Sequence, residues 1–241
     1  MKGLFIGTSG WIYKGWAGTF YPPEVKSTHH LEFYTGKFNT VEINATFYRL
    51  PLPTTVKAWH KRSPKNFVFA VKGSRFITQM KKLNVERASI KIYFERVKHL
   101  KEKLGPILWQ LPPNFGFNAE RLDHFLKIVP KKFQHAVEFR HPSWYERQET
   151  FEILRAHNAA HVGVSSLRMP MNLTVTGNFI YIRFHGLQHG PAHDYTEKEL
   201  RPWAEHCRNC LAQGLGVFAY FNNDWNTRAP LNAEMFRAMI R

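Results

Sequence analysis

Cysteines and long apolar runs are scarce in this chain of 241 residues. There are two cysteines, and no uninterrupted apolar stretch approaches the length of a membrane span. So few cysteines exclude a fold stabilised by several disulfide bonds, and they are typical of proteins in a reducing compartment. The segment Met1–Gly7 enters a short apolar strand and does not have the pattern of a signal peptide. We therefore expect a soluble, cytoplasmic protein with no membrane partner.

The two cysteines, Cys207 and Cys210, have a C-x-x-C spacing. A redox pair would be expected at a helix N-terminus directly after a strand, whereas these residues fall late in a helical pattern that begins near Thr196. Two thiols alone are also too few to hold a structural zinc. We interpret them as neighbouring residues of one helix.

Acidic residues are also few, with 18 Asp and Glu against 34 Lys and Arg, a formal net charge of +16. Such an excess attracts anionic substrates and nucleic acid at long range. Lysines scattered over outer helices would also keep a protein soluble without any specific site. Both interpretations remain open at this point.

The dominant pattern is a rhythm of short apolar runs that alternate with helical segments. The expected strands are Leu4–Gly7, Thr40–Asn44, Phe67–Lys72, Pro106–Leu111, Ala136–Arg140, His161–Ser165, Phe179–His185 and Gly216–Asn222. The expected helices are Thr28–Tyr34, Thr54–Arg62, Val85–Lys103, Ala119–Ile128, Trp144–His157, Glu197–Gln213 and Ala229–Ile240. Eight such units predict a single α/β domain, residues 1–241, folded as a (β/α)8 TIM barrel. Between the sixth and seventh strands, Ser166–Asn178 lacks a helical pattern and is predicted to be a loop.

Polar residues gather where the predicted strands end, which is where TIM barrels place their chemistry. Three pairs lie two residues apart and so share one strand face: Glu42 with Asn44, Glu138 with Arg140, and Arg183 with His185. These side chains should face the barrel mouth. The alternative is structural, since buried charges of both signs can also satisfy one another as a salt-bridge layer.

Several motifs resemble the YecE-like family, known as domain of unknown function 72. They are Gly7-Thr8-Ser9-Gly10-Trp11, Asn39-Thr40-Val41-Glu42-Ile43-Asn44, Phe69-Ala70-Val71-Lys72, Gln110-Leu111-Pro112-Pro113, Val137-Glu138-Phe139-Arg140-His141-Pro142-Ser143-Trp144 and Tyr220-Phe221-Asn222-Asn223. The resemblance runs in order from Gly7 to about Ala233. It implies a fold similar to triose-phosphate-isomerase-type barrels and implies no established reaction.

Four residues are candidates for proton transfer or nucleophilic chemistry. Glu42 and Glu138 could act as paired carboxylates, and His141 and His185 could act as general acids or bases because an unperturbed histidine titrates near neutrality. The neighbouring cations would keep both carboxylates ionised, which favours a role as a base or as groups that position arginine.

A second group of residues is predicted to bind substrate. Guanidinium and ammonium groups at the mouth suit a phosphate or carboxylate, and aromatic rings there could stack on a base or sugar. The group comprises Lys72, Arg75, Arg140, Arg183, Asn44, Gln110, Trp11, Tyr48, Trp144, Asn222, Asn223 and Asp224. No cofactor or metal ligand is predicted. A divalent metal stays possible, because His185, His189, His193 and Asp194 form a metal-like run and because Glu42, Glu138 and Asp224 could add oxygen ligands.

Three functions are compatible with this pattern. The first is a hydrolase or lyase acting on a phosphate-bearing small molecule or on nucleic acid. The second is a non-catalytic protein that binds nucleic acid through its +16 charge. The third is a carbohydrate-acting enzyme that uses Glu42 and Glu138. The sequence does not indicate an oligomeric state.

Overall fold

Eight parallel strands form the centre of the molecule in a computed structural model that describes residues 1–240. The strands are β1 (Gly3–Thr8), β2 (Thr40–Ile43), β3 (Val68–Lys72), β4 (Leu104–Gln110), β5 (His135–Glu138), β6 (Ala160–Ser165), β7 (Phe179–Phe184) and β8 (Gly216–Phe221). Each strand pairs with its neighbour in the chain, β1 pairs with β8, and a bridge between Ser9 and Glu42 connects β1 to β2. The sheet therefore closes into the predicted TIM barrel. Residue 241, the last of the predicted domain, lies outside the described residues.

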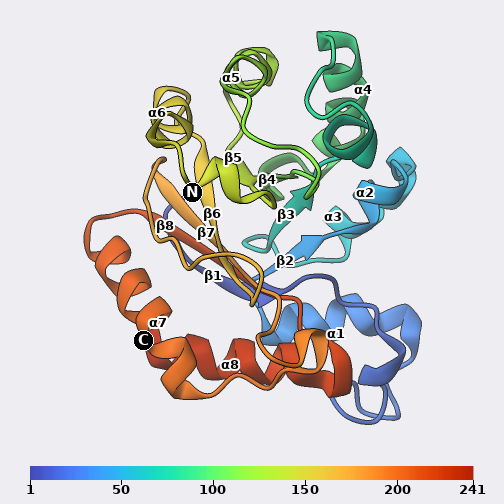
Figure 1. Ribbon diagram of the computed structural model, residues 1–241. Coiled ribbons are helices and arrows are strands. Elements are labelled where there is room, and N and C mark those ends of the chain that lie inside the picture. Colours follow the sequence, from blue (N-terminus) through green and yellow to red (C-terminus); the bar gives the residue numbers. More distant parts are fainter. Residues whose placement is uncertain (241) are drawn as a thin grey trace.

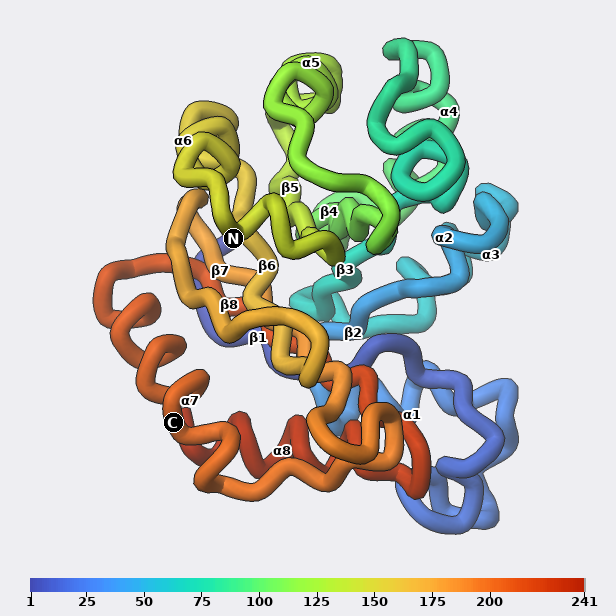
Figure 2. The backbone as a smooth tube through the Cα atoms, viewed as in Figure 1, coloured from blue at the N-terminus to red at the C-terminus, as the bar shows by residue number. Residues whose placement is uncertain are grey.

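Helices surround the ring of strands (Figure 1). They are α1 (His30–Lys37), α2 (Ala45–Tyr48), α3 (Pro53–Lys61), α4 (Arg87–Val97), α5 (Ala119–Ile128), α6 (Gln148–Ala156), α7 (Glu197–Ala212) and α8 (Arg228–Ile240). The tube in Figure 2 shows the red α8 returning beside the blue start of the chain. Within residues 1–240, no helix is long and apolar enough to span a membrane.

The segment between β6 and β7 is a loop, as predicted. It needs no helix because side chains satisfy part of its backbone: Thr176 Oγ1 donates to the carbonyl of Ala159 and accepts from the amide of His161. Asn158 Oδ1 likewise accepts from the amide of Asn178 at 2.9 Å. These bonds tie the loop to the start of β6.

The strand prediction was accurate in number and order but too long at some ends. β2 stops at Ile43, so Asn44 precedes the unpredicted short helix α2, and β5 stops at Glu138, so Arg140 lies in the following loop. The predicted helix from Trp144 is two pieces, a 3-10 turn at Pro142–Trp144 and α6.

Two apolar clusters follow from the alternation of side chains along the strands. The larger one lies between the strands and the helices, and it includes Ile43, Trp109 and Phe139. The smaller one fills the barrel interior, from Phe5, Phe179 and Phe218 at one end to Tyr181 and Tyr220 further along. Because side chains alternate in direction, the residues two positions beyond this interior set also face inward.

Cysteines 207 and 210 are buried and free in α7, as expected for two neighbouring helix residues. Burial raises the pKa of both thiols, which makes the reactive thiolate scarce. Their environment gives no support to a redox role.

Candidate functional site

A layer of paired charges lies above the aromatic interior, at the carboxyl-terminal ends of the strands. Glu42, Glu138 and Arg183 are at most 1% exposed, and they continue the inward face of β2, β5 and β7. Arg183 donates from Nε and Nη2 to the two oxygens of Glu42 at 2.9 and 2.8 Å, and from Nη1 to Glu138 Oε2 at 2.6 Å. One guanidinium therefore bridges two carboxylates from strands that are not neighbours.

The remaining carboxylate contacts come from polar side chains on or next to other strands and from Arg140 in the loop after β5. Glu42 accepts from Ser9 Oγ at 2.8 Å and from the Tyr181 hydroxyl at 2.7 Å. Glu138 Oε1 accepts from Gln110 Nε2 at 2.8 Å and pairs with Arg140 Nε. Every carboxylate oxygen thus has at least one donor, which satisfies groups that would be costly to bury alone.

These contacts keep both carboxylates ionised. Burial by itself would raise the pKa of Glu42, but the charge of Arg183 and the hydrogen bonds outweigh it and lower the pKa. The pKa of Glu138 is well below its ordinary value, because Arg140 and Arg183 outweigh the effect of burial. Neither group is therefore suited to donate a proton near neutrality.

His185 is held between the two arginines. Its Nε2 lies 2.7 Å from Arg140 Nη2 and 3.2 Å from Arg183 Nη1, and since a guanidinium can only donate, this nitrogen accepts. Its Nδ1 lies 3.1 Å from Nδ2 of Asn222, which is also a donor, and a neutral imidazole can accept at only one of its two nitrogens. Burial, and next the charge of Arg183, lower the pKa of His185 to about 4. The imidazole is therefore neutral and positions Arg140.

Arg140 and Lys72 are the cations that remain available to a ligand. The side chain of Arg140 is 22% exposed, unlike that of Arg183. The Nζ of Lys72 lies 4.2 Å from the ring centre of Phe47, a residue of α2. Lys72 faces inward because it follows Val68 and Ala70 of the interior cluster.

Other predicted site residues have structural roles. Trp144 is fully buried against Phe139 and donates from Nε1 to the carbonyl of Phe115 at 2.7 Å, so it has no surface for a ligand. Asn223 is also fully buried, and its amide donates to Asn232 and to the carbonyl of His193. Trp11 is 7% exposed and packs edge-on against Trp59.

The remaining predictions fall on loops around the mouth. His141 accepts through Nδ1 from the Ser143 amide, which caps the turn after β5. Tyr48 is 71% exposed and packs on Phe47. Arg75 is exposed and directly precedes a π-helical turn, Phe76–Met80. Asp224 is partly buried, and this burial raises the pKa of its carboxyl group. Asn44 is partly buried, with its Oδ1 lacking a hydrogen-bond partner within residues 1–240.

Histidines 185, 189 and 193 do not converge with Asp194. His193 Nε2 lies 3.3 Å from Glu199 at the start of α7, whereas His185 belongs to the charged layer. Over the described residues, no three His, Cys, Asp or Glu side chains are arranged to hold a metal ion.

Sequence reasoning missed Ser9 and Tyr181 as partners of the carboxylates. The signal for both was present, because Tyr181 precedes Arg183 by two residues and Ser9 continues the inward face of Phe5 and Gly7. Gly7 itself is required there, since a Cβ would lie 2.3 Å from the carbonyl oxygen of Thr40. The contact between Phe47 and Lys72 depends on the unpredicted helix α2.

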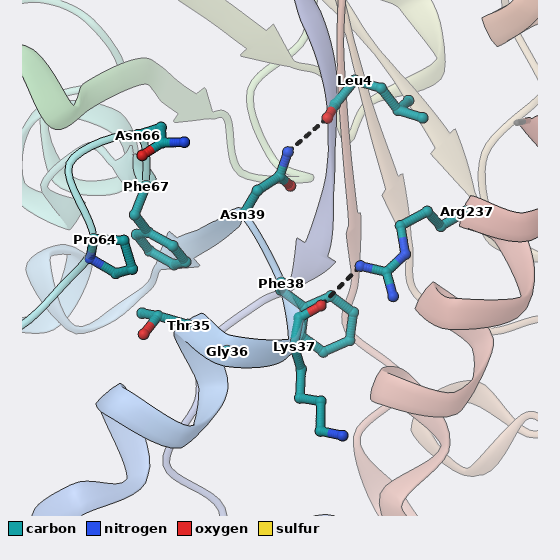
Figure 3. Close-up of a pocket in the computed structure, with 10 residues that line it drawn as sticks. All are labelled: Leu4, Thr35, Gly36, Lys37, Phe38, Asn39, Pro64, Asn66, Phe67 and Arg237. Atoms are coloured by element: carbon teal, nitrogen blue, oxygen red, sulfur yellow. Dashed lines mark hydrogen bonds between the residues drawn. The ribbon is translucent and has the colours of Figure 1, made fainter.

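A cavity lies at the opposite end of the barrel, but its polar groups do not resemble those of the charged layer. It measures about 330 Å³ and is lined by residues such as Phe38, Phe67 and Arg237 (Figure 3). The polar groups drawn there serve the fold: Arg237 donates to the carbonyl of Lys37, and Asn39 donates to that of Leu4. The charged layer at the mouth therefore remains the candidate site.

The fold and this layer define a TIM-barrel protein whose mouth is built on a buried Glu–Arg–Glu bridge. The chain belongs to the family described as Protein of unknown function DUF72, which matches residues 5–241. This confirms the resemblance seen in the motifs.

Known relatives match from 63% to 98% of this chain. UPF0759 protein YunF of Bacillus subtilis strain 168 is 26% identical over 98% of this chain and 94% of its own length. UPF0759 protein YecE of Escherichia coli K12 is 30% identical over 63% of this chain and 53% of its own length. The crystal structure of a DUF72 family protein from Thermotoga maritima MSB8 superposes with a TM-score of 0.89 at 28% identity, covering 98% of both chains. These names describe a family and a fold, and they specify no activity.

Proposed function

We propose that the protein is an enzyme, a hydrolase or lyase, that acts at the barrel mouth on a small phosphate-bearing substrate. The proposal rests on Arg140, whose partly exposed guanidinium keeps N–H donors available at the barrel mouth. Arg140 Nε is ion-paired with Glu138 but makes no hydrogen bond, and one N–H of Nη2 is directed at His185, so the other three N–H donors on Nη1 and Nη2 remain for a ligand. A guanidinium fixed in this way can bind a phosphate with two parallel hydrogen bonds.

The charge balance of the layer supports the same conclusion. Arg183 and Arg140 offset Glu42 and Glu138, and His185 is neutral, so the positive charge of Lys72 is left over. A site with one uncompensated cation and a free guanidinium edge favours an anion. Arg183 has a different role from the one expected, because its donors are engaged with the carboxylates.

The experiment is a titration of the protein with inorganic phosphate and with a phosphosugar by calorimetry at low salt. We expect wild-type protein to bind both, and Arg140→Gln to bind at least tenfold more weakly. Lys131→Gln is the matched control, because it removes one positive charge from an exposed position just before β5, at the opposite end of the barrel. Equal losses in the two variants, or no binding by the wild type, would overturn the proposal.

Nucleic-acid binding is the second candidate, and the net charge of +16 favours it. A surface of dispersed lysines would give an affinity for oligonucleotides that falls steeply with salt and is weakened equally by Arg140→Gln and Lys131→Gln. Paired-carboxylate glycoside hydrolysis is not favoured by the geometry, because no oxygen of Glu42 or Glu138 is free of a donor.

A further inference from the structure

Two lysines of this protein, Lys103 and Lys72, differ in how their ammonium groups are satisfied. Lys103, near the amino-terminal end of β4, donates from Nζ to the carbonyls of His60 and Ser63 and to Ser63 Oγ, at 2.6 to 3.0 Å. Lys72 Nζ makes no hydrogen bond or ion pair with residues 1–240 and lies over the ring of Phe47. Lys103 is therefore structural, whereas Lys72 is free to react with a ligand.

The backbone around Lys72 is fixed on both sides. Its carbonyl accepts from the hydroxyls of Thr46 and Tyr93, at 2.6 and 3.2 Å. The next residue, Gly73, donates to the carbonyl of Leu108 at 2.8 Å, and a Cβ at this position would lie 2.3 Å from the indole of Trp109. These contacts hold the Cα of Lys72 in one place at the strand end, so the amine is preorganised to face the mouth.

The electrostatic surroundings favour the neutral, nucleophilic amine. Burial, followed by the charge of Arg183, lowers the pKa of Lys72 to about 8; Glu138 and Glu42 act in the opposite direction, and Arg140 adds to the lowering. Roughly a tenth of the side chains would then be neutral at pH 7, against fewer than about one in a thousand for an ordinary lysine. Lysines desolvated or placed beside other cations are the ones that form Schiff bases.

We infer that Lys72 is a nucleophile that forms an imine with a carbonyl group of the substrate, whose phosphate Arg140 holds. Nζ of the neutral amine attacks the carbonyl carbon, and the carbonyl oxygen then leaves as water with one proton from the amine and one taken from solvent, so that amine, carbonyl and proton become a protonated imine and water. The protonated imine then withdraws electrons from the neighbouring carbon, as cleavage of a carbon–carbon bond requires. This inference rests on the proposed function and narrows it from hydrolase or lyase to a lyase acting on a phosphorylated aldehyde or ketone.

The test is trapping with sodium borohydride, which reduces an imine to a stable secondary amine. Wild-type protein is incubated with glyceraldehyde 3-phosphate or, in a parallel sample, with glyceraldehyde, then reduced and mapped by peptide mass spectrometry. We expect the phosphorylated probe to label Lys72 at least tenfold more than the exposed Lys131 and Lys57 of the same sample, which serve as internal controls. Inorganic phosphate and Arg140→Gln should each suppress the labelling of Lys72.

Lys72→Arg is the companion variant, because it keeps the positive charge but cannot form an imine. It should bind inorganic phosphate within about twofold of wild type, and its melting temperature shows whether the fold is retained. If wild-type protein binds phosphate but Lys72 is labelled no more than Lys131, the proposal of imine formation would be wrong. The proposed anion site would still be supported by the phosphate binding. Selective labelling by both probes alike would support the nucleophile and count against the anion site. Absence of both labelling and phosphate binding would overturn both proposals.

Discussion

The two ends of the barrel interior are filled by different chemistry. At the amino-terminal end, Phe5 stacks on Phe218 with ring centres 4.7 Å apart, and Phe179 meets Phe218 edge-on. At the carboxyl-terminal end, the same strand faces carry Glu42, Glu138 and Arg183. Apolar side chains of similar volume often stabilise a protein as well as a buried ion pair does, or better. Apolar packing such as that of the aromatic end is therefore sufficient to stabilise a barrel interior. Stability alone does not explain why the other end contains buried charges.

Removing the bridging guanidinium should have the largest effect. Arg183→Met would leave two carboxylates buried without their main partner, so we expect a loss of about 3 to 5 kcal/mol in the free energy of unfolding. Phosphate binding should fall as well, because Glu138 would no longer be held for Arg140. Urea denaturation and calorimetry measure the two effects. A loss below about 1 kcal/mol would mean that the layer is not a coupled network.

The corresponding change at the aromatic end should affect stability alone. Phe218→Ala removes a fully buried ring, with an expected cost of about 3 kcal/mol in unfolding free energy. We expect phosphate affinity to stay within about twofold of wild type in the folded variant. If phosphate affinity falls together with stability, the two ends of the barrel do not have separate roles in binding and in folding.

Acid should weaken the charged end through His185. Its folded pKa of about 4 lies below the ordinary value near 6.5, so below pH 6.5 the unfolded chain takes up a proton that the folded one does not. The stability that this neutral imidazole contributes is complete above pH 6.5 and is lost as the pH falls toward 4.

Burial also lowers the pKa of His135 and His161 to about 4, so the test must subtract their contribution. Between pH 6 and pH 5, His185→Gln should reduce the pH dependence of unfolding free energy by about 1 kcal/mol per pH unit. The exposed His29→Gln is the control and should leave the slope unchanged. Identical slopes in wild type and His185→Gln would show that His185 is already charged in the folded protein.

The smallest effect concerns the boundary between the two ends. The Tyr220 hydroxyl lies 2.8 Å from Thr40 Oγ1, which also donates to the carbonyl of Val68. Tyr220→Phe removes one hydrogen bond, with an expected cost of about 0.5 to 1 kcal/mol and no change in phosphate affinity. Thermal unfolding would detect this change, and a cost above about 2 kcal/mol would place Tyr220 within the charged network.

Much of the candidate site was predictable because strand geometry is periodic. Glu138 and Arg183 follow the inward-facing Ala136 and Tyr181 by two positions, and Glu42 follows the inward-facing Thr40, so their convergence at the mouth follows from the strand assignment alone. Trp144 was misassigned for the same kind of reason: its place after a strand suggested a loop at the mouth, whereas the 3-10 turn at Pro142–Trp144 directs it into the core. A turn of three residues leaves no periodic signal.

The sequence by itself determined the eight strands, the loop between β6 and β7, and the convergence of Glu42, Glu138 and Arg183 at one end of the barrel, because alternation and turn residues are local properties. Only the tertiary structure decided how the charges are shared. Ion pairing depends on which side chains meet across the barrel, and Arg183 meets both carboxylates whereas Lys72 meets neither as a hydrogen-bonded partner. Because of this ion pairing, Arg183 bridges two buried carboxylates and does not face a ligand. Arg140 and Lys72 are the cations that remain available to bind or react with a substrate.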